Sequence, residues 1–411
     1  MGFIADLQIH SRYARACSKD ISIANLEKYA RIKGLDLLGT GDFQHPKWFE
    51  EICSNLEEDD KGILWTKTKF PFLWQTEISL MFAKNGRRAV HLLVFSPGKE
   101  VSKQVIDVLG KKGRLDYDGR PIFGIQPNEF VDLMLSVSKD IELVPAHCMT
   151  PWFGIFGSDS GFDTVEECFE DRSKYIHALE TGMSADPEML WRNDNWNKFN
   201  LVSFSDAHSF WPWRLGREAT VFDGELSYKN ILNALRTGEN LRETIEVDPN
   251  YGKYHYDGHR NCGVVFDPGE SLKLGNKCPK CGKGLTIGVL NRVEGLANHP
   301  LGYKPRNAKD FRKIIPLHEL IAAAYSVSQL NSVKINNAYN ELIKNFGNEF
   351  NVLLNVDEGE LKKAVHEKLA KVIMMNRDGS LRVKPGYDGV YGKVMLEDNE
   401  RIINQKKLGE F

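Results

Sequence analysis

Apolar and polar residues alternate over the first ten positions in the pattern of a buried strand. In that strand the side chains of Asp6, Gln8 and His10 would share one face, while Leu7 and Ile9 would pack on the other. Polar side chains aligned at a buried strand end are costly unless something binds to them. The pattern therefore predicts a metal site here, although Gln8 carries an amide where an ionisable ligand is expected.

Strand and helix patterns alternate up to about residue 240. We expect Ser22 to cap a helix that Gly34 ends, and a second helix from about Pro46 to Glu58. Each of five predicted strands has a polar residue at or near one of its ends. Strand 35–42 ends at Asp42, strand 72–77 ends at Glu77, strand 89–95 has His91 near its start, strand 141–147 ends at His147, and strand 201–204 is followed by Asp206 and His208. Repeated strand–helix units predict a parallel sheet or barrel, whose functional residues gather at the carboxyl ends of the strands.

These polar residues have the chemistry of a hydrolytic metal centre. Carboxylate and imidazole ligands without thiolates suit zinc, manganese, iron or magnesium. The candidates are too many for one ion: Asp6, His10, Asp42, Glu77, His91, His147, Asp206 and His208. A bridging carboxylate such as Glu77 could hold two ions, which make a water acidic and stabilise the attacking and leaving oxygens of a phosphoester. No Ser/His/Asp motif, Walker loop or dinucleotide fingerprint competes with this interpretation.

Residues from about 250 to 290 predict a second, structural metal site. His259 and Cys262 form one knuckle, and Cys278 and Cys281 form another, each with two residues between the ligands. Tetrahedral zinc takes four nitrogen or sulfur ligands, and such knuckles supply them with little backbone strain. His255 is the competing fourth ligand.

The remaining C-terminal sequence predicts helices. Apolar spacing indicates helices in 317–330, 335–346 and 360–374, and the glycine-rich segment 385–392 should turn into a short final strand. Residues 303–313 carry five basic residues and one acid, so they form either a solvated linker or a strip that contacts DNA phosphates through Lys304, Arg306, Lys309 and Arg312. We divide the chain into a catalytic domain (1–245), a zinc-binding module (246–300) and a mainly helical, DNA-contacting domain (301–411).

Composition narrows the class of protein. With 411 residues and a net charge of −2, the chain should hold two or three domains and is not a strongly cationic protein. No apolar run is long enough to span a bilayer, and the N-terminus lacks the pattern of a secretory signal. We therefore expect a cytoplasmic enzyme.

In this order the motifs resemble the polymerase and histidinol phosphatase superfamily, and more closely the endonuclease Q family. The resemblance covers nearly the whole chain, through residues 6–11, 38–43, 77, 91, 145–147, 152–157, 178–182, 205–208, 215–219, the knuckles, 285–289 and 386–392. It implies an α/β fold with a distorted (β/α)7 barrel, a small zinc-binding module and a C-terminal helical domain.

The resemblance also implies a function. Such an enzyme nicks single- or double-stranded DNA on the 5′ side of deaminated bases (uracil, hypoxanthine, xanthine) and abasic sites, using two or three divalent ions (Zn²⁺, Mn²⁺ or Mg²⁺) beside a structural Zn²⁺. Contacts with replication or repair factors are a further implied class of partner.

The resemblance implies a role for each of several site residues. Gln8 and His10 fall on the first metal pair, Glu77 on the bridging carboxylate, His91 and His147 on a second ion, and Asp206 and His208 on the closing motif, with Glu77, Asp206 and His208 as the catalytic residues. Candidates for a third ion are Asp42, then His45, then Asp20.

A flipped lesion base needs a pocket with flat side chains and close backbone amides. The segment after His147 could supply one through Trp152, Phe153, Gly154, Phe156 and Ser158. Ordinary aromatic packing over the barrel mouth explains the same residues equally well.

Two other functions remain open. A phosphatase of small phosphomonoesters, of the histidinol phosphatase type, would need neither a zinc module nor a helical tail. A DNA-binding protein with a disabled catalytic site is the other, because Gln8 stands where a His ligand is expected, and loss of a ligand weakens metal binding.

Overall fold

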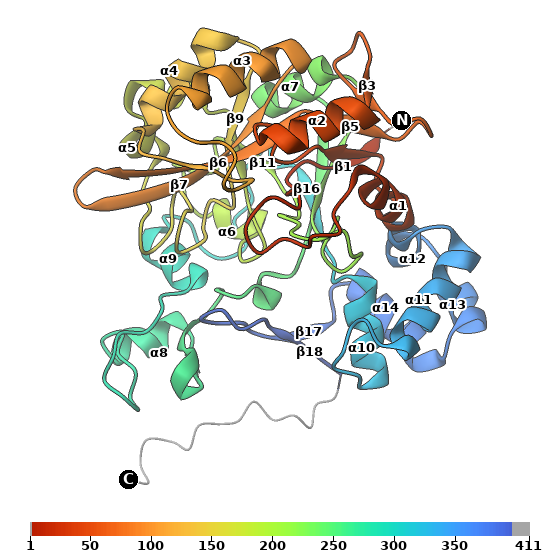
Figure 1. The fold of residues 1–411 in the computed structure, drawn as a ribbon. Helices are drawn as coiled ribbons and strands as arrows, with labels where there is room; N and C mark the ends of the chain where they lie inside the picture. Colours follow the sequence, from red (N-terminus) through yellow and green to blue (C-terminus); the bar gives the residue numbers. More distant parts are fainter. Residues whose placement is uncertain (1, 397–411) are drawn as a thin grey trace.

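In this computed structural model, residues 2–396 are described; the end of the predicted C-terminal domain, residues 397–411, lies outside them. A mixed α/β part occupies one end of the molecule, and the chain after it forms a small module and a helical region on the other side (Figure 1).

The largest sheet has eight strands in the order β16-β13-β12-β1-β2-β5-β4-β3. Their bounds are β1 Phe3–Asp6, β2 Leu37–Gly39, β3 Glu57–Glu58, β4 Leu64–Trp65, β5 Pro71–Leu73, β12 Ala219–Phe222, β13 Leu241–Glu246 and β16 Asp310–Lys313. The first strand pairs parallel with β2 and antiparallel with β12, so the sheet is mixed. The expectation of a purely parallel sheet is therefore wrong.

A second sheet has the order β8-β6-β7-β9, formed by β6 Gln75–Ala83, β7 Arg87–Phe95, β8 Ile122–Phe123 and β9 Glu142–Pro145. Strands β6 and β7 form a long antiparallel hairpin because Asn85 and Gly86, both with positive φ, make a tight turn between them. Glu77 lies near the start of β6 and His91 in the middle of β7, so the predictions that Glu77 ends a strand and that His91 opens one are wrong.

A short parallel pair, β10 Ala178–Glu180 and β11 Asn200–Val202, completes the strands of this part. The second sheet meets this pair through a backbone hydrogen bond after β9, in which Cys148 N donates to Glu180 O (2.8 Å). The strand ends that carry the candidate ligands are thereby brought to one side of the α/β part.

Helices cover the sheets on the outside (Figure 1). They are α1 Ile23–Lys33, α2 Pro46–Asn55, α3 Lys99–Gly110, α4 Pro127–Val137, α5 Val165–Phe169, α6 Pro187–Leu190 and α7 Tyr228–Thr237. The predicted limits of α1 are confirmed: Ser22 accepts a hydrogen bond from Asn25 N, and Gly34 ends the helix with φ +94°. The second helix ends at Asn55 rather than at Glu58, because Glu57 and Glu58 form strand β3.

The module after residue 250 is built from small elements, β14 Asp257–His259, β15 Val264–Phe266, α8 Pro268–Lys273 and α9 Val289–Leu296. Its own apolar cluster contains Val264, Phe266, Cys278 and Leu285. So small a core favours a metal as an additional source of stability.

The C-terminal region is helical, as predicted, with α10 Leu317–Tyr325, α11 Val333–Phe346, α12 Glu349–Leu354, α13 Glu358–Ala364 and α14 Glu367–Arg377. The hairpin of β17 Arg382–Lys384 and β18 Lys393–Met395 then returns to the module, where Tyr256 N donates to Gly386 O. Strand β16 pairs with β13, so residues 310–313 extend the large sheet. Within residues 2–396, no helix is long and apolar enough to cross a membrane.

Candidate metal centre

Six of the predicted ligands converge in two groups of three. His10, Asp206 and His208 form one group, and Glu77, His91 and His147 form the other; within each group the ligand atoms lie within 4.8 Å of one another. They come from the loop after β1, the β6–β7 hairpin, and the turns that follow β9 and β11. Imidazoles and carboxylates that converge in this way fit divalent metal ions.

Glu77 touches both groups. Its Oε1 lies 2.6 Å from His91 Nδ1 and 3.2 Å from His147 Nε2, and its Oε2 lies 2.8 Å from His10 Nε2. Burial favours the neutral acid, but Arg120 and the surrounding imidazoles hold the pKa of Glu77 well below its ordinary value. A buried anion between two sets of imidazoles has the geometry that a bridging ligand requires.

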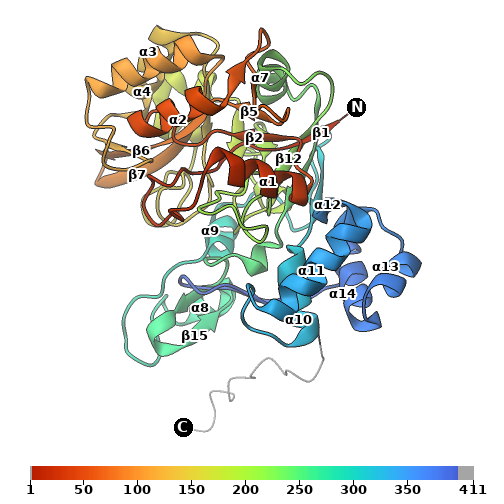
Figure 2. The ribbon, with the colours of Figure 1, turned by 45° about the vertical axis from the view of Figure 1, so that its right-hand side comes forward.

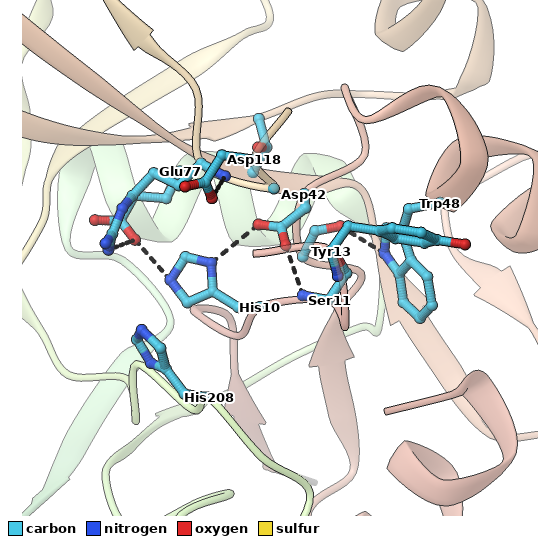
Figure 3. Close-up of polar contacts among 12 residues, drawn as sticks. His10, Ser11, Tyr13, Asp42, Trp48, Glu77, Asp118 and His208 are labelled. Carbon is cyan, nitrogen blue, oxygen red and sulfur yellow. Dashed lines mark hydrogen bonds and ion pairs between the residues drawn. The ribbon is translucent and has the colours of Figure 1, made fainter. Parts of the chain in front are cut away.

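Asp42 orients His10. One carboxylate oxygen lies 2.9 Å from His10 Nδ1, and the other accepts from Ser11 N at 2.6 Å (Figure 3). A carboxylate on one ring nitrogen fixes the imidazole and directs the other nitrogen to a metal. Burial opposes the charged form of His10, but Asp42, Asp206 and Glu77 raise its pKa well above the ordinary value.

The other candidates for a third ion lie apart. His45 stacks on Tyr13, with ring centroids 4.3 Å apart, and its buried Nδ1 has no partner among residues 2–396. Asp20 is exposed. Within the described chain, Asp42, His45 and Asp20 do not form a group of converging ligands.

Asp6, the first polar residue of the opening strand, stabilises the segment around Ser205 and Gly216 by hydrogen bonds. Its carboxylate accepts hydrogen bonds from Ser205 N (3.0 Å), Ser205 Oγ (2.5 Å) and Gly216 N (2.9 Å). Burial raises its pKa to about 6. Asp6 thereby anchors the loop that presents Asp206 and His208.

Gln8 is fully buried and faces Glu180, a residue that the sequence analysis did not single out as a site residue. With its amide nitrogen turned toward this carboxylate, Gln8 donates to Glu180 Oε2 at 2.7 Å. Glu180 also accepts from His147 N (2.6 Å), and burial raises its pKa well above the ordinary value. A metal-binding role for Gln8 stays a prediction.

A cavity of about 390 Å³ opens over the two groups of ligands. Of the predicted pocket residues, Trp152 and Phe153 line it, and Phe153 stacks on His91 with ring centroids 4.3 Å apart. The other three lie outside the lining: Gly154 packs against the backbone of Thr150, Phe156 is buried on Trp196, and Ser158 donates to Ile287 O.

The lining of the cavity also contains Arg217, Glu218, Tyr254 and Tyr391, to which no sequence motif gave a role. Arg217 Nη1 and Glu218 Oε2 are buried and have no hydrogen-bond partner among the described residues. Although burial favours the neutral phenol, Arg217 and Arg214 lower the pKa of Tyr391 to about 8. The motifs 215–219 and 386–392 were the signals for Arg217, Glu218 and Tyr391, but the contacts among them join elements distant in sequence.

The predicted zinc ligands form the third converging group of the described chain: His259, Cys262, Cys278 and Cys281 lie within 4.8 Å of one another. Burial favours the neutral thiol, but hydrogen bonds from the backbone of Lys280 and Cys281 lower the pKa of Cys278 to about 6, which favours the thiolate that a metal binds. His255 lies elsewhere, with Nδ1 3.3 Å from Ser184 O and its ring stacked on Tyr256.

The basic strip is largely engaged in ion pairs. Lys304 pairs with Asp310 (3.0 Å), and Arg312 pairs with Glu243 (2.8 Å). Arg306 and Lys309 line a second cavity, of about 740 Å³, at Asn200. That residue begins β11, whereas Asp206 follows its other end, so the two cavities lie at opposite ends of this strand.

Comparison with known proteins gives matches over the whole fold. The crystal structure of the lesion-specific endonuclease PfuEndoQ from Pyrococcus furiosus is 28% identical and superposes with a TM-score of 0.86, covering 97% of this chain and 96% of that one. A structure of endonuclease Q with a 27-mer duplex that carries an abasic lesion at its active site is 28% identical, with a TM-score of 0.87 and 97% of each chain covered.

Sequence comparison adds two matches. Residues 316–380 match the family model described as the MJ0043 C-terminal domain. The uncharacterized protein MJ0043 of Methanocaldococcus jannaschii is 32% identical over 257 residues, which are 61% of this chain. The chain spans about a third of the length of that relative, 32%.

Proposed function

We infer that this chain belongs with the endonuclease Q enzymes, and from that premise we propose that it is a metal-dependent DNA repair endonuclease. One observation supports the proposal: the chain matches an endonuclease Q structure over 97% of its length, and two groups of candidate metal ligands converge beside one cavity. In finer detail, we propose that the strands of the α/β part form a distorted (β/α)7 barrel with these ligands at its mouth.

The residues present fit the ions that this family implies. His10, Asp206 and His208 would hold one ion, His91 and His147 another, and Glu77 would join them; the four residues of the knuckles would hold structural Zn²⁺. When bound, Zn²⁺, Mn²⁺ or Mg²⁺ would lower the pKa of a water and offset charge on the phosphate. Two carboxylates of the chain fix the positions of the ligands: Asp42 orients the His10 ring, and Asp6 anchors the loop that carries Asp206.

We propose that the cavity takes a flipped deaminated base, 5′ of which the strand is nicked. Uracil, hypoxanthine and xanthine each present a carbonyl beside a ring N–H, and an enzyme that flips a base reads this edge by hydrogen bonds. Trp152 and Phe153 offer flat surfaces, and the polar side chains of Thr150, Arg217 and Glu218 line the same cavity. The same cavity would admit an abasic nucleotide, which needs no such contacts.

Cleavage mapping on a defined duplex tests the proposal. End-labelled duplexes with one uracil, hypoxanthine, xanthine or abasic site, and an undamaged duplex, would be incubated with Mg²⁺, Mn²⁺ or Zn²⁺. We expect a single nick directly 5′ to the lesion and none in undamaged DNA. Absence of a break with every metal would refute the nuclease, and hydrolysis of a generic phosphomonoester alone would favour the phosphatase.

One observation favours a second candidate, a DNA-binding protein with a weakened catalytic site. Gln8 is directed at Glu180, and a neutral amide is a poor replacement for an imidazole ligand. Fluorescence anisotropy with the abasic duplex distinguishes the two: tight, lesion-dependent binding without a nick would support the second candidate.

A further inference from the structure

The loop before β8 places an arginine in the metal centre. Arg120 Nη1 lies 3.3 Å from Glu77 Oε2, and its side chain is 26% exposed while Glu77 is fully buried. Arg120 lines the same cavity as His91, His147 and Asp206. Its guanidinium therefore lies at the boundary between the buried ligands and the space that a substrate would fill.

Contacts on both sides hold the loop in place. Gly119 N donates to Tyr13 O (3.2 Å), Gln44 donates to Gly119 O, and Ser79 N donates to Pro121 O (3.1 Å). Asp118 accepts from the backbone N–H groups of both Arg15 and Arg120 at 3.1 Å.

Gly119 fits closely against the carboxylate of Asp42, and a Cβ at this position would collide with it. The carboxylate that orients His10 therefore also limits the position of the arginine loop. A guanidinium on so constrained a loop is pre-organised, which reduces the entropy lost when it binds an anion.

Most of the donors of Arg120 remain available. A guanidinium has five N–H donors in a planar fork that matches the oxygens of a phosphate. Glu77 is the one side-chain partner found for it in the part of the chain that the structure describes. Burial opposes the charge, but Glu77 and Asp206 raise the pKa of Arg120 further, so the group remains a cation.

We propose that Arg120 is a catalytic residue that binds a non-bridging oxygen of the scissile phosphate. This inference rests on the proposed nuclease function. In the reaction a water oxygen bonds to phosphorus, one phosphorus–oxygen ester bond breaks, and the proton that the water loses is balanced by one gained by the leaving oxygen. Negative charge grows on the non-bridging oxygens in the transition state, and a fixed guanidinium offsets it.

Single-turnover cleavage of the abasic duplex tests the proposal. Arg120→Ala is expected to slow the cleavage step about 10²- to 10³-fold, the usual effect of removing one fixed donor to such a charge. Arg120→Lys should recover only part of the rate because it cannot offer the planar fork. Arg114→Ala is the matched control: this arginine of the same segment is 75% exposed, pairs with Asp116 and does not line the cavity.

Metal content separates a role at the phosphate from a role through Glu77. The purified Arg120→Ala variant should retain the wild-type complement of bound Mn²⁺ or Zn²⁺, measured by elemental analysis. Loss of barrel metal in this variant would overturn the proposal, because Arg120 would then act by positioning a ligand. Cleavage by Arg120→Ala at the wild-type rate would overturn it as well.

A duplex with one uncharged linkage allows a binding measurement that does not depend on cleavage. A duplex with a methylphosphonate at the linkage 5′ of the lesion should weaken wild-type binding about tenfold more than it weakens binding by Arg120→Ala, since each charge-assisted hydrogen bond contributes about that factor. Equal losses in the two proteins would refute the contact. If the wild type binds this duplex but does not nick the normal one, the nuclease function fails while the binding comparison still decides the role of Arg120.

Discussion

Three buried carboxylates near the opening strand have different roles, and the role of each follows from its hydrogen-bond partners. Asp6 accepts three hydrogen bonds from Ser205 and Gly216, so its oxygens stabilise a loop. Asp42 holds the ring of His10 and the N–H of Ser11. Glu77 contacts imidazoles of both ligand groups. Of the three, Glu77 is best placed to bind metal directly.

Replacement of Gln8 tests the most unusual residue of the site. Gln8→His should raise metal-dependent nicking about 10- to 100-fold, the size of effect that ligand-sphere changes produce, and leave DNA affinity nearly unchanged. Nicking rates and anisotropy with the abasic duplex measure the two effects. Gln126→His, at the start of α4 and outside the cavity, is the control. Equal activity of Gln8→His and wild type would show that position 8 does not bind metal.

His255 should make the stability of the protein sensitive to acid. Burial lowers its pKa from 6.5 to about 4. Between these pH values the unfolded chain binds a proton that the folded chain does not, so the free energy of unfolding falls as the pH falls from 6.5 to 4. A shift of this size corresponds to about 3 kcal/mol at the acid end.

Urea unfolding between pH 7 and pH 4 measures this dependence. His255→Gln should flatten it, whereas His366→Gln, at the exposed start of α14, should not. Identical slopes for His255→Gln and wild type would contradict the predicted role of burial.

At the scale of elements, the hairpin of β6 and β7 explains how Glu77 reaches His91. The register pairs Glu77 with Leu93 and Ser79 with His91, so the two ligands lie diagonally across neighbouring strands. A parallel pair would have needed a crossover connection, whereas the tight turn at Asn85 and Gly86 makes the pair antiparallel. The two ligands are therefore set by strand pairing, although neither ends its strand.

The knuckles provide a prediction for the small module. Cys278→Ser should remove one equivalent of zinc and loosen residues 250–290, because metal binding supplies folding free energy to so small a core. Metal bound by Glu77 and the imidazoles around it should remain. Elemental analysis and limited proteolysis measure both outcomes, and Cys53→Ser, on α2 outside the ligand group, is the control. A full complement of zinc in Cys278→Ser would rule out the assignment.

At the scale of the molecule, a buried ion pair joins the α/β part to the helical region. Helices α1 and α12 lie side by side (Figure 2). Lys33, at the end of α1, lies 2.7 Å from Glu349, the first residue of α12, and both are almost fully buried. Glu349 also accepts from Leu317 N and Tyr339 Oη. One carboxylate thus connects α1, α10, α11 and α12.

Removal of one partner should be costly. Lys33→Met leaves the carboxylate buried without its cation and should lower the free energy of unfolding by about 3–5 kcal/mol. Thermal and urea unfolding measure this change. Lys362→Met is the control, since that lysine forms an exposed i,i+4 pair with Glu358. A loss below about 1 kcal/mol for Lys33→Met would show that the pair does not connect the two parts.

The sequence alone was sufficient to predict the features that depend on residues close together in the chain. The cap and stop of α1, the helical character of the C-terminal region and the similarity to endonuclease Q were predicted and are confirmed, and the four knuckle residues converge. The predicted helix 360–374 is wrong as a single helix, because α13 ends at Ala364 and α14 begins at Glu367. Six predicted ligands also converge. Four of them follow strand ends, which meet on one side of an α/β fold, whereas the pairing of β6 with β7 brings Glu77 and His91 to the same place.

Only the tertiary structure decided which contacts each of these residues makes, and therefore which role each has in the site. Arg120 reaches Glu77 across 43 positions of sequence, and Glu180, Arg217 and Glu218 enter the site from loops and strands that no local pattern connects to it. The same holds for Asp42, whose type suits a ligand but whose two oxygens already bond to His10 and Ser11. A residue type states which bonds a side chain can make, whereas the packing of distant segments selects the ones that it does make.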